Sequence, residues 1–138
     1  MTRLQTIARS VEAKRILEVG TGDGSATVQL ASVLPPDGMV ITMEADPSVA
    51  ARARKQFAAA GDGHRITVIV GLPSRFLHKV SGPFDVVFEN GESGLPRDRL
   101  LALIRAGGVL IRANTKYISE GHNEEERGDA ALSIQVKA

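Results

Sequence analysis

The segment from Arg15 to Ser25 constrains the fold more than any other part of the chain. It reads Arg15-Ile-Leu-Glu-Val-Gly-Thr-Gly-Asp-Gly-Ser25, an apolar run followed by three glycines at alternate positions. The apolar run predicts a buried strand, and the helical spacing of apolar residues over 25–33 predicts a helix directly after the glycines. Glycine allows positive φ and lets a ligand approach the main chain closely. The segment therefore predicts a strand, a ligand-binding turn and a helix.

Two familiar phosphate-binding turns do not fit this segment. In the dinucleotide fingerprint the third glycine follows the second by three residues, and the residue at that position here is Ser25. A P-loop needs a closing Gly-Lys-Ser/Thr, which the segment lacks. A tight connection that binds nothing is a further interpretation, but acidic residues near the turn favour a ligand without phosphates.

Those acidic residues indicate what the ligand is. Residues 39–44 form a second apolar run, and Glu44 at its end is placed to accept hydrogen bonds from both hydroxyls of a ribose. Glu18 lies one strand over, within reach of a cationic amino-acid group. An adenosine joined to a charged amino acid points to S-adenosylmethionine.

Several motifs resemble a known family, the class I S-adenosylmethionine-dependent methyltransferases. The resemblance rests on Leu17-Glu-Val-Gly-Thr-Gly-Asp-Gly24 and Ile41-Thr-Met-Glu-Ala-Asp-Pro47. More narrowly, the chain is similar to the catechol and caffeoyl-CoA O-methyltransferase group over residues 4–115. The motifs for this are Lys14-Arg-Ile-Leu-Glu-Val-Gly-Thr-Gly22, Leu34-Pro-Pro-Asp-Gly38, Phe84-Asp-Val-Val-Phe88 and Arg105-Ala-Gly-Gly-Val-Leu-Ile111.

The resemblance implies a Rossmann-like α/β fold with a doubly wound, mostly parallel sheet, helices on both faces and a reduced C-terminal region. It also implies S-adenosylmethionine as the cofactor, with the adenine ring packed at the turn after the third strand. The residues expected to bind the cofactor are Glu18, Gly20, Thr21, Gly22, Ser25, Glu44, Ala45, Gly71, Leu72, Pro73 and Asn90.

The chain departs from this group at the metal site. The group holds a divalent cation with an Asp after the fourth strand and an Asp-Asn pair after the fifth, and a nearby Lys serves as general base. Matching the motifs places Asn90 at the first ligand position and Ser93 at the lysine. It places Ala113 and Asn114 at the other two ligand positions. Because Mg²⁺ prefers carboxylate oxygens, we expect no metal site and a metal-independent protein.

Apolar spacing and turn residues divide the chain into alternating strands and helices. Asp46 before Pro47 predicts the start of a helix whose buried face is Val49, Ala53 and Phe57. Other helices are expected at 4–11, 25–33, after residue 73 and at 97–105, and strands at 15–19, 39–44, 65–70, 84–88, 109–112 and 131–136. This alternation predicts a mostly parallel sheet built by right-handed crossovers, with the ligand at the carboxyl ends of the strands.

Composition excludes several classes of protein. With 138 residues, 43% hydrophobic and 24% charged, the chain is expected to form one cofactor-binding domain over residues 1–138. Its 17 Lys and Arg against 16 Asp and Glu leave a net charge of +1, which favours neither nucleic acid nor membrane as a partner. It has no cysteine, so we expect a cytoplasmic protein without disulfides. One expected strand after Thr115 leaves an open sheet edge, which favours a homodimer.

The leading functional hypothesis is methyl transfer to an oxygen, or second to a nitrogen, of a small molecule. Glu89, Asn90 and Asn114, at the ends of the fourth and fifth strands, are the candidate catalytic residues that face the acceptor. Asn90 fits equally well as a turn residue before Gly91. Glu89 and Glu92 are the acids that could hold a metal from shifted positions.

Two other functions stay open. One is a catalytically inactive S-adenosylmethionine-binding protein with a regulatory or oligomeric role. The other is a nucleic-acid methyltransferase, but the Asn/Asp-Pro-Pro-aromatic motif typical of that class is absent after the fourth strand. Asp85 occupies a position where the family has a strand residue, and we expect it to be structural.

Overall fold

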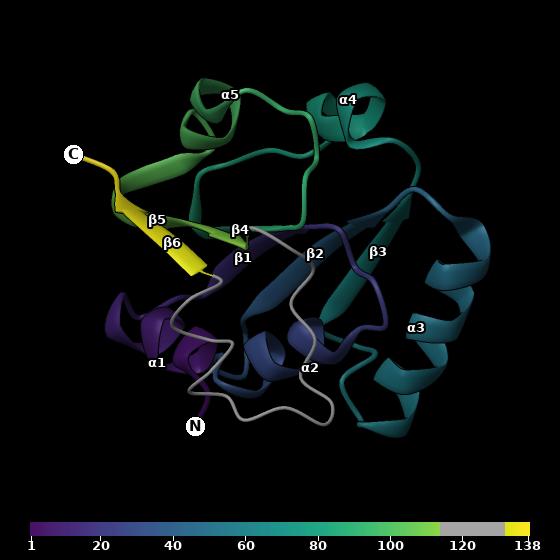
Figure 1. Cartoon of the computed structure of the whole chain (residues 1–138). Coiled ribbons are helices and arrows are strands. Elements are labelled where there is room, and N and C mark those ends of the chain that lie inside the picture. Colours follow the sequence, from purple (N-terminus) through teal and green to yellow (C-terminus); the bar gives the residue numbers. More distant parts are fainter. Residues whose placement is uncertain (114–131) are drawn as a thin grey trace.

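The computed structural model describes residues 1–113 and 132–138, which form a six-stranded sheet in the order β3-β2-β1-β4-β5-β6 (Figure 1). The first five strands pair in parallel, and the last pairs antiparallel with β5. The expectation of a mostly parallel sheet is confirmed. The strands are β1 (Arg15–Val19), β2 (Met39–Glu44), β3 (Ile66–Val70), β4 (Phe84–Asn90), β5 (Ile104–Ala113) and β6 (Leu132–Val136).

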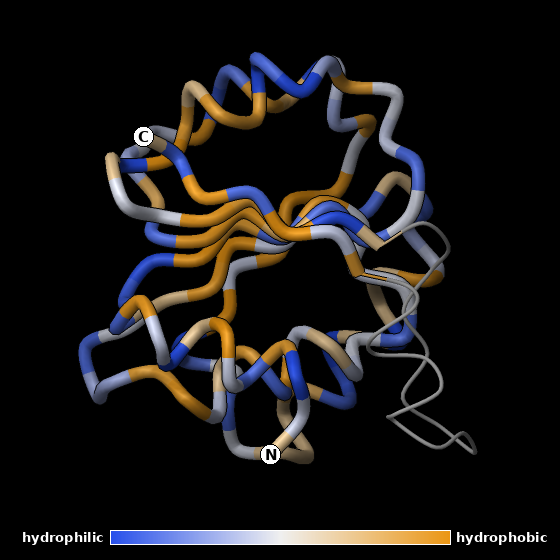
Figure 2. Tube along the Cα trace, turned by 60° about the vertical axis from the view of Figure 1, so that its left-hand side comes forward, coloured by the Kyte–Doolittle hydropathy of each residue, from blue (hydrophilic) through white to orange (hydrophobic). Residues whose placement is uncertain are grey.

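Helices cover both faces of the sheet, as a doubly wound fold requires (Figures 1 and 2). One face carries α1 (Arg3–Ser10), α2 (Ser25–Ser32) and α3 (Pro47–Ala59). The other carries α4 (Pro73–Phe76), the short 3₁₀ helix η1 (Leu77–Lys79) and α5 (Arg97–Leu101). None of the described helices is long and apolar enough to span a bilayer.

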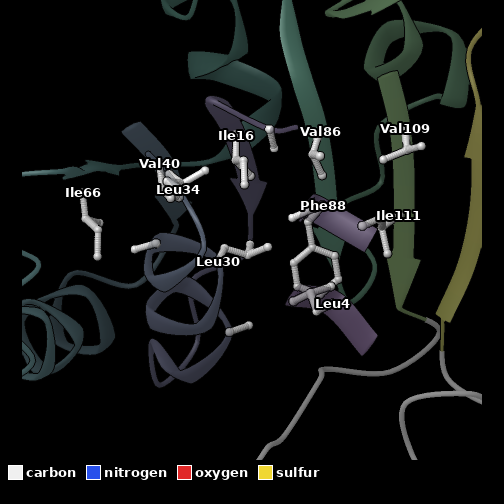
Figure 3. Close-up of a cluster of buried hydrophobic side chains, with 14 of the residues drawn as sticks. Leu4, Ile16, Leu30, Leu34, Val40, Ile66, Val86, Phe88, Val109 and Ile111 are labelled. Atoms are coloured by element: carbon white, nitrogen blue, oxygen red, sulfur yellow. The ribbon is translucent and has the colours of Figure 1, made fainter. Parts of the chain in front are cut away.

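Each layer of helices buries its own cluster of apolar side chains against the sheet. In the larger cluster, Phe88 of β4 points toward Leu4 of α1, and Leu30 of α2 packs among strand residues (Figure 3). The smaller cluster joins Val87 and Leu110 to Leu100 of α5. Alternate residues of β4 thus face opposite layers, which explains why its sequence is apolar throughout.

The start of α3 follows the prediction. The Asp46 side chain accepts hydrogen bonds from the backbone N–H groups of Ser48 and Val49, and Pro47 occupies the first turn. The buried face differs by one residue, because Ala50 is buried with Ala53 and Phe57 while Val49 is only half-buried.

The predicted helix at 97–105 is too long. It ends at Leu101, and β5 begins at Ile104, before the two glycines that we expected to precede the strand. Ile104 pairs with Phe84, and the register then shifts so that Val86 pairs with Val109. Pairing with β4 therefore overrides the helical spacing of this segment, since tertiary contacts outweigh weak local propensity.

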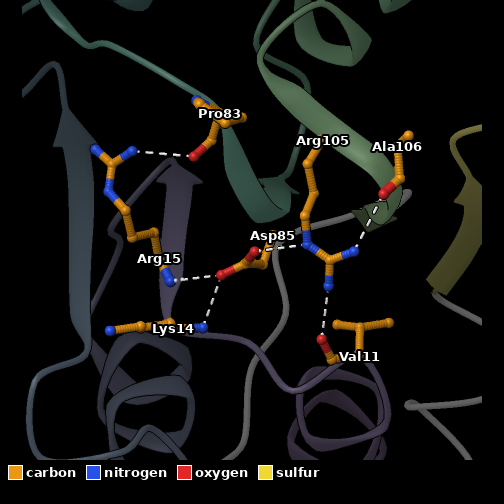
Figure 4. Close-up of polar contacts among 7 residues, drawn as sticks. All are labelled: Val11, Lys14, Arg15, Pro83, Asp85, Arg105 and Ala106. Carbon is orange, nitrogen blue, oxygen red and sulfur yellow. Dashed lines mark hydrogen bonds and ion pairs between the residues drawn. The ribbon is translucent and has the colours of Figure 1, made fainter.

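Asp85 ties the amino ends of the central strands together (Figure 4). Its carboxylate accepts hydrogen bonds from the backbone N–H groups of Lys14 and Arg15, both at 2.8 Å, and from Arg105 Nε at 2.7 Å. Arg105 also donates to the carbonyl of Val11. The structural role expected for Asp85 is confirmed, at the edge of the sheet opposite the glycine turn.

The strand order reverses between β1 and β4. From β1 the chain winds outward to β2 and β3 on one side and to β4 and β5 on the other. Open α/β sheets bind ligands at the carboxyl ends of the strands at such a switch point. The glycine turn after β1 lies there.

Candidate functional site

The glycine turn fits tightly between β2 and β4. The N–H groups of Gly20 and Thr21 both donate to the carbonyl of Met43, at 2.9 and 3.1 Å. Gly20 has φ +101°, and a Cβ atom there would lie 2.6 Å from the carbonyl oxygen of Asn90. Only glycine therefore allows this turn to approach the end of β4 so closely.

Glu44 links the end of β2 to the same turn. One carboxylate oxygen accepts the N–H of Gly22 at 3.0 Å, and the other accepts the N–H of Asp46 at 3.0 Å. The residue is buried, with 7% of its surface exposed. Each carboxylate oxygen can accept two hydrogen bonds, so Glu44 is fixed in place and keeps capacity for the hydroxyls of a ligand.

A cavity of about 380 Å³ opens at the carboxyl ends of β1, β2 and β4. Six of the residues predicted to bind the cofactor line it: Gly20, Glu44, Ala45, Leu72, Pro73 and Asn90. Sequence analysis missed Val19 and Met43, whose strand positions gave no polar signal, and did not assign Gly91, Glu92 or Ser93 to this cavity.

Four other predicted cofactor residues do not line this cavity: Thr21, Gly22, Ser25 and Gly71. Gly22 acts through its N–H on Glu44. The N–H of Ser25 donates to the side chain of Asp23 at 2.9 Å, within the turn that opens α2.

Glu18 does not line the cavity, which corrects the expectation that it reaches the ligand directly. It is fully buried in β1, and one carboxylate oxygen accepts the hydroxyls of Thr27 and Thr42 at 2.5 and 2.6 Å. Because Thr42 gives its only hydroxyl proton to Glu18, Thr21 must donate to Thr42 across their 2.6 Å contact. A chain of hydroxyls thus joins the buried carboxylate to the glycine turn.

Burial raises the pKa of Glu18 to about 7 from its ordinary value of 4.5. The hydrogen bonds from Thr27 and Thr42 oppose this shift, whereas the negative charges of Asp23 and Glu44 add to it. Its second oxygen has no hydrogen-bond partner within the described residues.

Glu89 and Asn90, two of the candidate catalytic residues, lie at the end of β4 as expected. Their surroundings differ. Asn90 is buried and lines the first cavity. Glu89 accepts hydrogen bonds from Arg112 Nε at 2.7 Å and from the Ser93 hydroxyl, and it lines a separate cavity with Arg112. Sequence analysis missed Arg112, although its pairing with Glu89 in neighbouring strands follows from the sheet register. The third candidate, Asn114, lies outside the described residues.

The described residues offer little to a divalent cation. Within residues 1–113 and 132–138, no three or more His, Cys, Asp or Glu side chains form a group that could hold a metal ion. At the positions matched to the metal ligands, the structure describes an amide at Asn90 and a methyl group at Ala113. An amide oxygen and a methyl group, with no aspartate, make a poor site for Mg²⁺, which prefers carboxylate oxygens.

Known proteins share the fold of this chain and have related sequences. The crystal structure of the O-methyltransferase TomG from Streptomyces achromogenes, in complex with SAM, superposes with a TM-score of 0.76 and 36% identity, covering 80% of this chain and 53% of that one. The catechol O-methyltransferase of Niastella koreensis is 39% identical over 133 residues, which is 88% of this chain and 60% of the relative. The catechol O-methyltransferase of Mycobacterium tuberculosis is 40% identical over 114 residues, 78% of this chain and 51% of the relative.

The chain thus spans about half to three-fifths of the length of these relatives. Their names do not favour the alternative of an inactive binding protein. The model of the O-methyltransferase family matches residues 3–136, nearly the whole sequence. The chain therefore belongs to the O-methyltransferase family.

Proposed function

We propose that this protein is an S-adenosylmethionine-dependent methyltransferase that transfers a methyl group to an oxygen of a small molecule, with nitrogen as the second choice of acceptor atom. The observation that carries the proposal is the Glu44 carboxylate, held by the N–H groups of Gly22 and Asp46 on the wall of a cavity at the switch point of the sheet. A relative of known structure, TomG, is in complex with SAM.

The residues present fit this cofactor. Glu44 would accept the ribose hydroxyls, and the glycine turn would lie against the amino-acid part with no side chain at Gly20 to block it. Leu72 and Pro73 offer apolar surfaces for a flat base. A volume of about 380 Å³ is in the range of pockets that bind small molecules of this size.

When bound, S-adenosylmethionine would supply a sulfonium methyl group. The C–O bond to the acceptor hydroxyl would form as the C–S bond breaks, with release of S-adenosylhomocysteine and of the hydroxyl proton to solvent. The part of the protein is to hold the acceptor in line and close to the methyl carbon. Asn90, at the end of β4 on the cavity wall, is positioned to orient groups there, and Glu89 and Asn114 complete the proposed acceptor-facing set. Glu89 is already bonded to Arg112 and Ser93, which disfavours it as a general base.

We further propose a metal-independent site in a domain that spans residues 1–138. The amide and methyl groups at Asn90 and Ala113 support metal independence, because they replace carboxylates. A homodimer is proposed from the edge strand β6, whose Ile134 and Val136 are exposed. The cytoplasmic location expected from composition stays a prediction.

The test is formation of S-adenosylhomocysteine from S-adenosylmethionine with a panel of small phenols, followed by mass spectrometry of the methylated product. We expect turnover with at least one phenol, at equal rates with Mg²⁺ and with EDTA. Turnover that is abolished by EDTA would contradict the metal-independent site. Methylation of an RNA or DNA substrate in place of every phenol would contradict the small-molecule acceptor.

A further inference from the structure

A second cavity, of about 310 Å³, lies beside the first. The two share Gly91 and Glu92, which line both of them. The wall of the second cavity is polar and charged, and its side chains include Glu89, Arg97, Arg112 and Ser133. A ligand there would lie next to whatever occupies the first cavity.

Arg112 is held in a fixed orientation on this wall. It pairs with Glu89 across β4 and β5, and its Nε donates to the Glu89 carboxylate at 2.7 Å. The Glu89 side chain is 3% exposed, whereas that of Arg112 is 32% exposed. Over residues 1–113 and 132–138, no protein group is hydrogen-bonded to the two terminal nitrogens of Arg112. As far as residues 1–113 and 132–138 are concerned, this guanidinium is anchored through Nε and keeps a pair of donors for a ligand.

The groups that remain for a ligand in this cavity are mainly donors. The formal charges of Glu89, Glu92, Arg97 and Arg112 cancel. The Glu89 side chain, however, is only 3% exposed and is bonded to Arg112 and Ser93, whereas the side chain of Arg112 is 32% exposed. Arg97 is exposed at the start of α5 and adds a second guanidinium to the wall. Glu92, an exposed acid, lines both cavities.

We propose that the second cavity binds the methyl acceptor and that Arg112, positioned by Glu89, recognises a carboxylate on it, with Arg97 as a second contact. This inference rests on the proposed function and narrows the acceptor to small hydroxylated carboxylic acids. A planar carboxylate matches the two terminal N–H groups of a guanidinium through parallel hydrogen bonds, which a lysine cannot provide. The carboxylate would lie at Arg112 while the acceptor hydroxyl extends past Gly91 and Glu92 toward the first cavity.

The experiment compares 3,4-dihydroxybenzoate with its methyl ester, which has the same hydroxyls but no negative charge. Each is titrated calorimetrically into protein saturated with S-adenosylhomocysteine, so that binding is measured without turnover. We expect the acid to bind about tenfold to a hundredfold more tightly than the ester, as for a charge-assisted hydrogen-bonded pair. Equal affinities for acid and ester would overturn the inference.

Three variants assign the effect to residues. The double variant Glu89→Gln/Arg112→Gln removes both charges together and leaves no unpaired buried acid, and we expect it to erase the preference for the acid. Arg112→Lys keeps the charge but loses the paired donors, and should lose most of the preference. The matched control is Arg99→Gln, because Arg99 lies on the same short helix as Arg97 but outside the cavity lining. This variant should keep the preference for the acid. A preference that survives the double variant would overturn the inference.

The titration with S-adenosylhomocysteine separates this inference from the proposed function. It is run first on every protein. If S-adenosylhomocysteine does not bind the natural sequence, the proposed function and the acceptor site both fail. Suppose instead that S-adenosylhomocysteine binds the natural protein and the double variant equally. If the acid and the ester then bind the natural protein with equal affinity, only the acceptor inference fails.

Discussion

The Glu44 carboxylate accepts the backbone N–H of Gly22 at 3.0 Å, so the acid that ends β2 is bonded to the glycine turn that follows β1. Two motifs separated along the sequence are therefore one unit in the structure. The second oxygen of Glu44 accepts the N–H of Asp46, which precedes α3. A ligand that bonds to Glu44 would meet a carboxylate already oriented by the backbone, and little conformational entropy would be lost on binding.

Replacing Glu44 by Ala should weaken binding of S-adenosylhomocysteine by about 1–3 kcal/mol, because the proposed ribose contacts are lost and the Gly22 N–H loses its acceptor. Glu44→Gln keeps the shape of the side chain and one acceptor oxygen. Its affinity for S-adenosylhomocysteine should therefore lie between those of the natural protein and of Glu44→Ala. Isothermal calorimetry gives the affinities, with Asp98→Ala, an exposed acid of α5, as the control. Unchanged affinity in a folded Glu44→Ala protein would refute the assigned contact.

Gly20→Ala should both destabilise the fold and weaken cofactor binding. The new Cβ would lie 2.6 Å from the carbonyl oxygen of Asn90, and φ there is +101°. We expect a loss of about 1–3 kcal/mol in the free energy of unfolding, measured by urea denaturation. Gly63→Ala is the matched control, since nothing lies within 4 Å of a Cβ at that position and its φ is not in the positive range. Equal stabilities for the two variants would contradict the tight fit of the turn.

Glu18 predicts a pH dependence of stability. Its folded pKa, about 7, lies above the ordinary value of 4.5, so between these values the unfolded chain releases a proton that the folded protein keeps. The stability linked to this group is fully present below pH 4.5 and is lost as pH rises through 7. A glutamine at this position does not titrate, so Glu18→Gln should not lose this stability. The free energy of unfolding of Glu18→Gln minus that of the natural protein should therefore rise by about 3 kcal/mol from pH 4.5 to 8. A difference that is flat over this range would show that Glu18 ionises normally.

Asp85→Asn should destabilise the protein by about 1–3 kcal/mol without changing the affinity for S-adenosylhomocysteine. Burial alone would raise the pKa of Asp85, but the N–H groups of Arg15 and Lys14 and the Arg105 guanidinium outweigh it and lower the pKa below 3.8. The contribution is therefore present above pH 3.8 and lost as pH falls, so the difference between the two proteins should shrink in acid. Urea denaturation measures it, and equal stability at pH 7 would contradict the anchoring role.

Much of the fold could be predicted from local sequence, because strong local signals agree with the tertiary structure. The apolar runs at 15–19 and 39–44 are the observed bounds of β1 and β2, and Asp46-Pro47 marks the start of α3. The start of β5 could not be predicted in this way. Ile104 and Arg105 continue a helical spacing, and only the partners Phe84 and Asp85, distant in sequence, draw them into the sheet.

Part of the candidate site could likewise be predicted from the sequence. Residues at strand ends, such as Gly20, Glu44 and Asn90, could be located because parallel strands end at one edge of a sheet. The burial of Glu18 could not be predicted, since it depends on the hydroxyls of Thr27 and Thr42 from two other elements. Arg112 was missed because its role depends on a partner in the neighbouring strand.

The most direct test of the central claim is a calorimetric titration of S-adenosylmethionine and S-adenosylhomocysteine into the purified protein, first with Mg²⁺ and then with EDTA. The account predicts binding of both in the micromolar range, with the same affinity in the two buffers. Binding that requires Mg²⁺ would contradict the metal-independent site. Failure of both ligands to bind in either buffer would contradict the assignment of the cavity beside Glu44 to the cofactor.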